Sequence, residues 1–374
     1  MKQHQWLRPI SVFVLTTLLL SACSFSAEVL STPTSVSSIP PTSTQVSPTA
    51  SPTPAPVLRV DTVDRLAIFM SRGKGEVLRS IAFTPDSTVL ASMATDNEDF
   101  AIRLWNVANG QPLGTLKGHK SIVWGLAFSP DGQMLASVSS DGTAKLWDWR
   151  AGTLLKSLDF PSQVVSVSFS PDGQTLAVGG VDESSNGQQN AAIWTFSVGS
   201  WGPLIKFPEF LNIPALAFSP DGSLLVGGGA SRNVQVWRTS DGAPVFTLNH
   251  AHQVSSLAIS PDGSTVATGT CETVVASDCT QGSVWLWDLH TGKLIRQLAG
   301  FPDGVESVAF SLNGSLLIAG SRGGTLRAYA IADYLPLLET TSPGGIGVLA
   351  LSPNGRLLAT GSYSGEVNLW NVQP

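Results

Sequence analysis

Phe128-Ser129-Pro130-Asp131-Gly132 is a turn sequence that recurs along most of the chain. Pro favours the second position of a type I turn, Asp tolerates the third, and Gly takes the positive φ that closes a bulged hairpin. Apolar runs flank each copy, so each copy is predicted to join two strands. The copies, some of them looser, begin at positions 83, 128, 169, 218, 259, 310 and 351. A hairpin repeated every 41 to 51 residues predicts a repeat architecture.

An aromatic residue lies in a further apolar run after each turn. The seven residues are Trp105, Trp147, Trp194, Trp237, Trp287, Tyr329 and Trp370. With the strand before each turn and one more strand, every unit has four strands. One such sheet cannot bury both faces, whereas seven sheets stacked radially bury them against each other. We therefore predict that the aromatic residues pack between sheets, the alternative being a stack of rings that binds a ligand.

These units resemble WD40 repeats, and the resemblance extends from Val57 to Pro374. It implies an all-β fold, a seven-bladed WD40 β-propeller with four antiparallel strands per blade. The seventh unit has only three strands before the chain ends. In the family an N-terminal strand usually completes the last blade, and Arg65 to Ser71 is predicted to do so here.

The second repeat carries the polar set of the family in full. Its members are His119, Ser137, Asp141 and Trp147. The resemblance implies a structural hydrogen-bonded chain that starts at the indole N–H. The alternative, a hydrolase triad, is disfavoured because Ser137 lies within a predicted strand and not on the sharp turn that exposes a nucleophile. No catalytic residue, metal or cofactor is predicted.

The N-terminus has the features of a processing segment. Lys2 and Arg8 form a positive segment before an apolar run from Ile10 to Leu20, which predicts a signal peptide over residues 1–22. The end of this run, Leu20-Ser21-Ala22-Cys23, resembles the lipobox of bacterial lipoproteins. The resemblance implies cleavage before Cys23 and lipidation of its thiol, hence a lipid-anchored protein of the cell envelope, outside the cytoplasm. An ordinary signal peptide and an uncleaved anchor remain the alternatives.

Composition divides the rest of the chain. From Ser24 to Pro56, 22 of 33 residues are Ser, Thr or Pro, so residues 23–56 are predicted to form a lipidated, disordered tether. Residues 57–374 form the predicted propeller. The chain has 21 basic and 27 acidic residues, a formal net charge of −6, and no basic cluster. Nucleic acid is therefore not an expected partner, because phosphate binding needs a basic surface. We expect a monomer.

Length varies between the second and third strands of alternate units. The spacing from turn aromatic to third-strand aromatic is 19 residues in four repeats, and 22, 25 and 28 in repeats one, three and five. Insertions on one rim often mark a binding face. The insertions contain Asp96, Asn97, Glu98 and Asp99, then Asp182 and Glu183, then Cys271 to Gly282. Asp96, Asn97 and Asp99 form either a solvated turn, the preferred interpretation, or a Ca²⁺ site.

Cys271 and Cys279 flank one of these insertions. Outside the cytoplasm, this placement predicts a disulfide that closes the loop, the alternative being two free thiols.

One position near the start of each innermost strand varies while its neighbours are apolar or small. It holds Arg79, Trp124, Val165, Pro214, Ser255, Glu306 and Gly347. We predict that this position faces the rim of the central channel. Arg79 and Trp124 are a candidate contact pair for a protein partner, with simple core packing of Trp124 as the alternative. The candidate partner-binding face combines Arg79, Trp124 and Glu306 with residues of the first and second insertions, namely Asp96, Asn97, Glu98, Asp99, Asp182 and Glu183.

Two functions fit these patterns. The first is a non-catalytic platform for protein partners, tethered to the envelope. The second is an envelope enzyme, or a small-molecule or sugar-binding propeller, with its site at the channel mouth and Glu306 among its residues. The fold itself does not choose between them.

Overall fold

The computed structural model describes residues 67–70, 77–94, 99–182, 190–210, 215–229, 232–275 and 278–372. In these ranges the chain forms 28 strands in seven four-stranded antiparallel sheets, as predicted. Cys23, Asp96, Asn97, Glu98, Glu183 and Pro214, together with the predicted signal peptide and tether, lie outside the described residues. Nowhere in the described ranges is there a helix of the length and apolarity that crossing a membrane requires.

The blades follow one another along the chain. Blades one to three contain β2 (Leu78–Phe83), β3 (Val89–Ala94), β4 (Ile102–Asn106), β5 (Pro112–Leu116); β6 (Val123–Phe128), β7 (Met134–Ser139), β8 (Thr143–Asp148), β9 (Thr153–Asp159); β10 (Val164–Phe169), β11 (Thr175–Asp182), β12 (Asn190–Ser197), β13 (Pro203–Phe210). Blades four to seven contain β14 (Ala215–Phe218), β15 (Leu224–Gly228), β16 (Asn233–Arg238), β17 (Pro244–Asn249); β18 (Val254–Ile259), β19 (Thr265–Val275), β20 (Asp278–Asp288), β21 (Leu294–Phe301); β22 (Val305–Phe310), β23 (Leu316–Ser321), β24 (Thr325–Ala330), β25 (Pro336–Thr341); β26 (Val348–Leu351), β27 (Leu357–Gly361), β28 (Glu366–Asn371) and β1 (Ala67–Met70).

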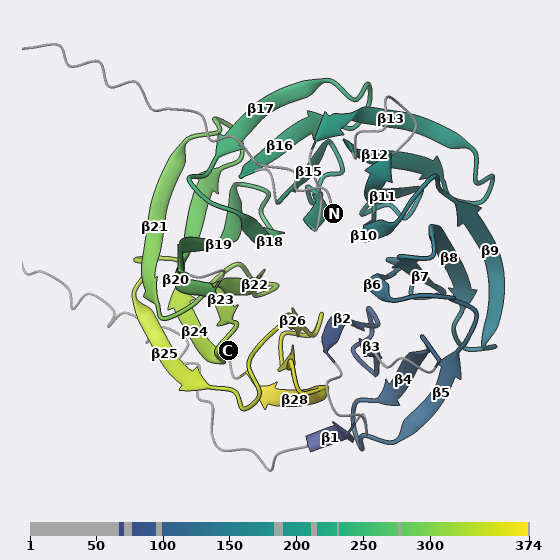
Figure 1. Cartoon of the computed structure of the whole chain (residues 1–374), viewed down its shortest axis with the longest axis horizontal. Helices are drawn as coiled ribbons and strands as arrows, with labels where there is room; N and C mark the ends of the chain where they lie inside the picture. Colours follow the sequence, from purple (N-terminus) through teal and green to yellow (C-terminus); the bar gives the residue numbers. More distant parts are fainter. Residues whose placement is uncertain are drawn as a thin grey trace, which may run out of the picture. The chain divides into compact units, whose positions relative to one another are not determined.

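The seven sheets close into a ring (Figure 1). Each innermost strand contacts the innermost strand of the next blade, and β26 contacts β2. The turn motif follows the innermost strand in every blade. The turn motifs therefore gather at one end of the central channel, and the starts of the innermost strands gather at the other.

Closure uses the N-terminal strand, as predicted. β1 pairs antiparallel with β28, with Ala67 opposite Asn368 and Met70 opposite Glu366. The seventh sheet thus has the order β1-β28-β27-β26, and its outer strand comes from the opposite end of the sequence. This pairing covers the edge of β28.

The turn motif is held by its own side chains. The Ser129 hydroxyl donates to Asp131 Oδ1 at 2.5 Å and accepts from the N–H of Met134 at 2.9 Å, while the N–H of Gly132 donates to the carbonyl of Ser129 at 2.8 Å. Gly132 has a φ of +67°. A Cβ at Gly132 would lie 3.3 Å from Cδ of Pro85, in the turn of the preceding blade. The glycine therefore serves both the turn and the contact between blades.

The third-strand aromatics pack in the seams between blades. Trp147, for example, is 2% exposed and packs with Leu104 and Leu116 of blade one. Indole N–H groups of this row donate to hydroxyls of the neighbouring strand, as Trp105 does to Ser92 at 2.9 Å and Trp370 to Thr360 at 2.9 Å. The row is part of the core.

The insertion in blade five differs from the predicted loop. β19 and β20 continue pairing out to Val275 opposite Asp278, so most of Cys271 to Gly282 is strand. The segment contains Thr273, Val274 and Val275, and β-branched residues favour extended backbone. An insertion that keeps this composition lengthens the hairpin instead of forming an irregular loop.

Candidate functional site at the channel mouth

A cavity of about 320 Å³ opens where the innermost strands begin. The structure describes six of the seven residues at the variable position of these strands, and all six line this cavity. They are Arg79, Trp124, Val165, Ser255, Glu306 and Gly347. Five of these residues each present a side chain from a different blade, Gly347 contributes backbone only, and Gln163 and Tyr363 complete the polar lining. We call this set of residues the channel mouth.

Arg79 and Trp124 form a pair across blades one and two. The guanidinium carbon of Arg79 lies 5.0 Å from the ring centroid of Trp124. The indole Nε1–H donates to the Ser140 hydroxyl at 2.6 Å, which fixes the orientation of the ring. Trp124 is half-buried and Arg79 is exposed. An oriented aromatic ring beneath an exposed guanidinium is the type of contact that anchors protein interfaces.

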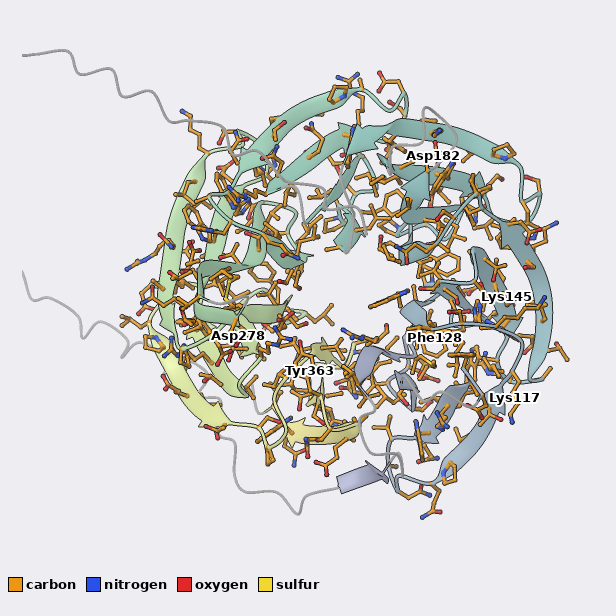
Figure 2. All side chains as sticks on the ribbon, in the orientation of Figure 1. Lys117, Phe128, Lys145, Asp182, Asp278 and Tyr363 are labelled. Carbon is orange, nitrogen blue, oxygen red and sulfur yellow. A yellow bond between two sulfur atoms is a disulfide. The ribbon has the colours of Figure 1, made fainter. Side chains whose placement is uncertain are left out.

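Glu306 lies across the mouth beside Tyr363 and Arg322. Burial raises the pKa of the Glu306 carboxyl, against the opposing effects of the Arg322 guanidinium, the Tyr363 hydroxyl and Arg79. Burial and the Glu306 carboxylate raise the pKa of Tyr363 to about 12. Tyr363 therefore stays protonated, and its hydroxyl is a donor to the carboxylate. Figure 2 shows Tyr363 on the inner side of the ring.

Sequence reasoning missed Tyr363 and Arg322. Both occupy the turn between the second and third strands, at the position that holds Ser140 in blade two. Tyr363 lines the mouth, whereas Ser140 accepts a hydrogen bond from Trp124 and the guanidinium carbon of Arg322 lies 5.5 Å from the ring centroid of Tyr363. This turn position therefore lines the mouth in blade seven and contacts its lining residues in blades two and six. Aligning the short turns as well as the inserted ones would have found them.

The polar set of blade two forms one hydrogen-bonded chain. The Trp147 indole donates to the Ser137 hydroxyl at 2.8 Å, Ser137 Oγ lies 2.8 Å from His119 Nε2, and His119 Nδ1 lies 2.9 Å from Asp141. Burial opposes ionisation of Asp141, but hydrogen bonds from His119, Thr143 and the Lys120 N–H outweigh it and hold the pKa well below its usual value. Ser137 is 0% exposed, so no substrate reaches its hydroxyl. This chain supports the fold of the blade.

Cys271 and Cys279 are joined by a disulfide. The disulfide joins β19 to β20 within the long end of the hairpin that these two strands form. A Cβ placed on Gly304 would lie 3.1 Å from Cys279 Sγ. The disulfide thus packs against the loop that leads into β22, two residues before Glu306.

A family model described as "WD domain, G-beta repeat" matches residues 110–148, 152–184, 207–238, 242–288, 292–329 and 337–371. These ranges cover more than half of the chain. The chain belongs to the WD40 repeat family. The turn motifs, the tryptophan row and the polar set are therefore WD40 features.

Curated relatives share parts of the WD40 propeller. Eukaryotic translation initiation factor 3 subunit I of Neurospora crassa is 38% identical over 95 residues, 25% of this chain and 27% of the relative. The same subunit of Pyricularia oryzae is 36% identical over 95 residues, with the same coverage. Periodic tryptophan protein 2 of Arabidopsis thaliana is 28% identical over 226 residues, 60% of this chain and 23% of the relative. The chain spans about a quarter of the length of these relatives.

Asp182 and Asp99, two acidic residues of the predicted partner-binding face, do not line the channel mouth. Asp182 is 1% exposed and pairs with Lys206 of the neighbouring strand, so its assignment to an exposed partner-binding face is wrong. Figure 2 shows it farther from the ring's centre than Tyr363. Asp99 lies 3.6 Å from Arg103 and 3.5 Å from Lys117 and does not line the mouth. The Asp99 carboxylate forms ion pairs with these two basic side chains.

A larger cavity lies near the turn motifs of blades three and four. Its volume is about 510 Å³, and its lining includes Asp172 and Asp221. Both carboxylates are occupied by their own turns, since Ser170 donates to Asp172 at 2.5 Å and Ser219 donates to Asp221 at 2.5 Å. This cavity offers apolar surface but no free ionisable group among the described residues that line it.

Proposed function

We propose that this chain is a non-catalytic WD40 platform that binds a protein partner at its channel mouth. The observation that carries the proposal is the oriented Arg79–Trp124 pair, which shares one open cavity with Glu306. Tryptophan and arginine are enriched among the few residues that carry most of the binding energy at protein interfaces. The relative from Neurospora crassa is, by its name, a subunit of an initiation factor, and this agrees with a role in protein assembly.

The proposal includes attachment to the bacterial cell envelope. The sequence Leu20-Ser21-Ala22-Cys23 supports lipidation of Cys23, and the stretch from Ser24 to Pro56 supports a tether that holds the propeller away from the membrane. Metabolic labelling with a radioactive fatty acid tests this part. We expect label on the full chain and none on a Cys23→Ser variant; equal labelling of both would refute the anchor.

Partner binding is tested by capture from the native membrane fraction. The baits are soluble Val57 to Pro374, the same bait with Trp124→Ala, and a control bait with Tyr334→Ala. Tyr334 is a matched control because it also pairs with an arginine, Arg296, whose guanidinium carbon is 5.5 Å from its ring centroid, but it follows a third strand at the opposite end of the channel. A partner retained by the first and third baits and lost with Trp124→Ala would establish the proposal. A partner retained equally by all three would place the interface elsewhere.

Binding of a small molecule or sugar is the second candidate, and the raised pKa of Glu306 favours it. A catalytic site here would need several ionisable groups that converge at the channel mouth. Glu306 is the one carboxylate among the described residues lining the mouth, whereas glycoside hydrolysis ordinarily needs two. If none of the baits retains a protein, thermal-shift screening of sugars against wild type and Glu306→Gln becomes the deciding measurement.

A further inference from the structure

A second cavity, of about 360 Å³, adjoins the channel mouth at blades four, five and six. It shares Ser255 and Glu306 with the mouth. Three neighbouring blades contribute to its walls. We call it the arginine cavity, and the residues that define it are Arg232, His252, Cys271, Cys279, Glu306 and Arg322.

The charge of this cavity is opposite to that of the whole chain. Two guanidinium groups and an imidazole line it, and Glu306 is the one carboxylate among its described lining residues. The chain as a whole carries a formal charge of −6. Because burial disfavours the charged form of Glu306, this carboxyl offsets the arginines less than an exposed one would.

Both arginines are accessible to solvent. Arg232 adopts a φ of +66°, and its backbone is fixed by a bond from its N–H to Gly229 and a bond to its carbonyl from the His250 N–H at 2.9 Å. Its side chain is exposed, and no carboxylate of a described residue pairs with it. Arg322 is also exposed, and its guanidinium lies against Tyr363.

The remaining wall is covalently restrained. Cys271 and Cys279 both line the cavity, and the same disulfide packs against Gly304. A wall that is fixed before binding costs less conformational entropy when a ligand enters.

We propose that the arginine cavity binds a carboxylate of an acidic peptide segment, which extends from a partner bound at the channel mouth. This proposal rests on the proposed platform function and names the chemistry of its partner. Planar guanidinium groups bind carboxylates through paired, charge-assisted hydrogen bonds. A peptide is favoured over a nucleic acid because two arginines in an acidic protein provide no basic track for a phosphate backbone.

Fluorescence anisotropy tests the proposal with a short, labelled peptide of alternating glutamate and glycine. The protein is soluble Val57 to Pro374, and the variants are Arg232→Gln and Arg322→Gln. Arg356→Gln is the matched control, since Arg356 is also exposed but directly follows the turn motif of blade seven, at the other end of the channel. Loss of a charge-assisted hydrogen bond should weaken peptide binding about tenfold or more in each test variant. The control should bind as wild type does.

Competitors identify the ligand class. An analogous peptide with glutamine in place of glutamate should not bind. The carboxylate assignment would be overturned if inorganic phosphate or a single-stranded oligonucleotide, added at the same concentration as the peptide, displaced it. Equal affinity in wild type, Arg232→Gln and Arg322→Gln would overturn the site. If the peptide binds as expected but no bait captures a protein, the platform function is refuted and the carboxylate site is retained. If a bait captures a protein but the peptide does not bind, only the carboxylate site is refuted.

Discussion

At the scale of single residues, a turn glycine can meet two separate requirements: a positive φ and close contact with the neighbouring blade. Gly132 and Gly355 have nearly the same backbone, with φ of +67° and +70°. A Cβ on Gly132 would lie 3.3 Å from Pro85, whereas a Cβ on Gly355 would meet nothing within 4 Å. Gly355→Ala should therefore cost only the left-handed backbone strain, about 1–2 kcal/mol of unfolding free energy. Gly132→Ala should cost more, because the seam between blades must also widen.

Urea denaturation of the two variants measures this difference directly. If Gly355→Ala is as destabilising as Gly132→Ala, contact with the neighbouring proline contributes nothing, and backbone conformation alone accounts for the motif.

A second prediction concerns His250, which stays neutral in the core of blade five. Its Nε2 lies 2.8 Å from Thr268 Oγ1 and 3.1 Å from the indole nitrogen of Trp287, which donates to it. Burial lowers the pKa of His250 from 6.5 to about 4. As the pH falls below 6.5, the unfolded chain binds a proton before the folded chain does. The stabilisation present above pH 6.5 is therefore lost progressively towards pH 4 and amounts to roughly 3 kcal/mol.

The measurement compares unfolding free energies at pH 7 and pH 4.5 in wild type and His250→Gln. The variant should lose less stability on acidification, by roughly 2–3 kcal/mol. His290→Gln removes an exposed histidine of the same blade and should behave as wild type. Identical acid sensitivity in wild type and His250→Gln would show that His250 does not carry this linkage.

The residue scale also shows which parts of the site were predictable. Arg79, Trp124 and Glu306 were found because the propeller gives every inner strand the same register, so a variable residue among apolar neighbours must face the channel. Asp182 was misassigned because charge alone does not reveal a partner on the adjacent strand, here Lys206. Arg322 was missed because its turn has the length found in most blades, so the comparison of loop lengths did not single it out.

At the scale of elements, the long hairpin of blade five carries a covalent cross-link. The disulfide joins residues that are 8 positions apart. Closing a loop of this size should stabilise the folded chain by about 2–3 kcal/mol, chiefly by restricting the unfolded state. A double variant, Cys271→Ala with Cys279→Ala, should lose about this much unfolding free energy. Reductant should destabilise the wild type to the same extent and leave the double variant unchanged. If reductant still destabilises the double variant, the effect of reductant has a cause other than reduction of the Cys271–Cys279 disulfide.

Elements were predicted where the repeat fixes them. Turn motifs and tryptophans located the innermost three strands of each blade, because their spacing is set by the chain length a blade requires. The insertion of blade five was predicted as a loop because spacing counts residues without distinguishing extended pairing from irregular backbone. Its β-branched residues carried that information.

At the scale of the whole molecule, one short strand from the N-terminal part of the chain completes the last blade of the ring. β1 supplies the outer strand of blade seven by pairing with β28. Without it, the unpaired groups of Glu366–Asn371 would form a free sheet edge. A chain that begins at Val77 should therefore unfold at lower urea concentration than one that begins at Val57, and it should self-associate in sedimentation experiments.

Rescue separates closure from other effects of the deletion. A synthetic peptide with the sequence Arg65 to Ser71, added to the chain that begins at Val77, should raise its urea midpoint and return it to a monomer, while a scrambled peptide should do neither. The strand binds by backbone pairing to a defined edge, so its contribution need not be covalent. If the shortened chain is as stable and as monomeric as the longer one, blade seven holds the ring closed with three strands, and β1 only covers an edge that was already harmless.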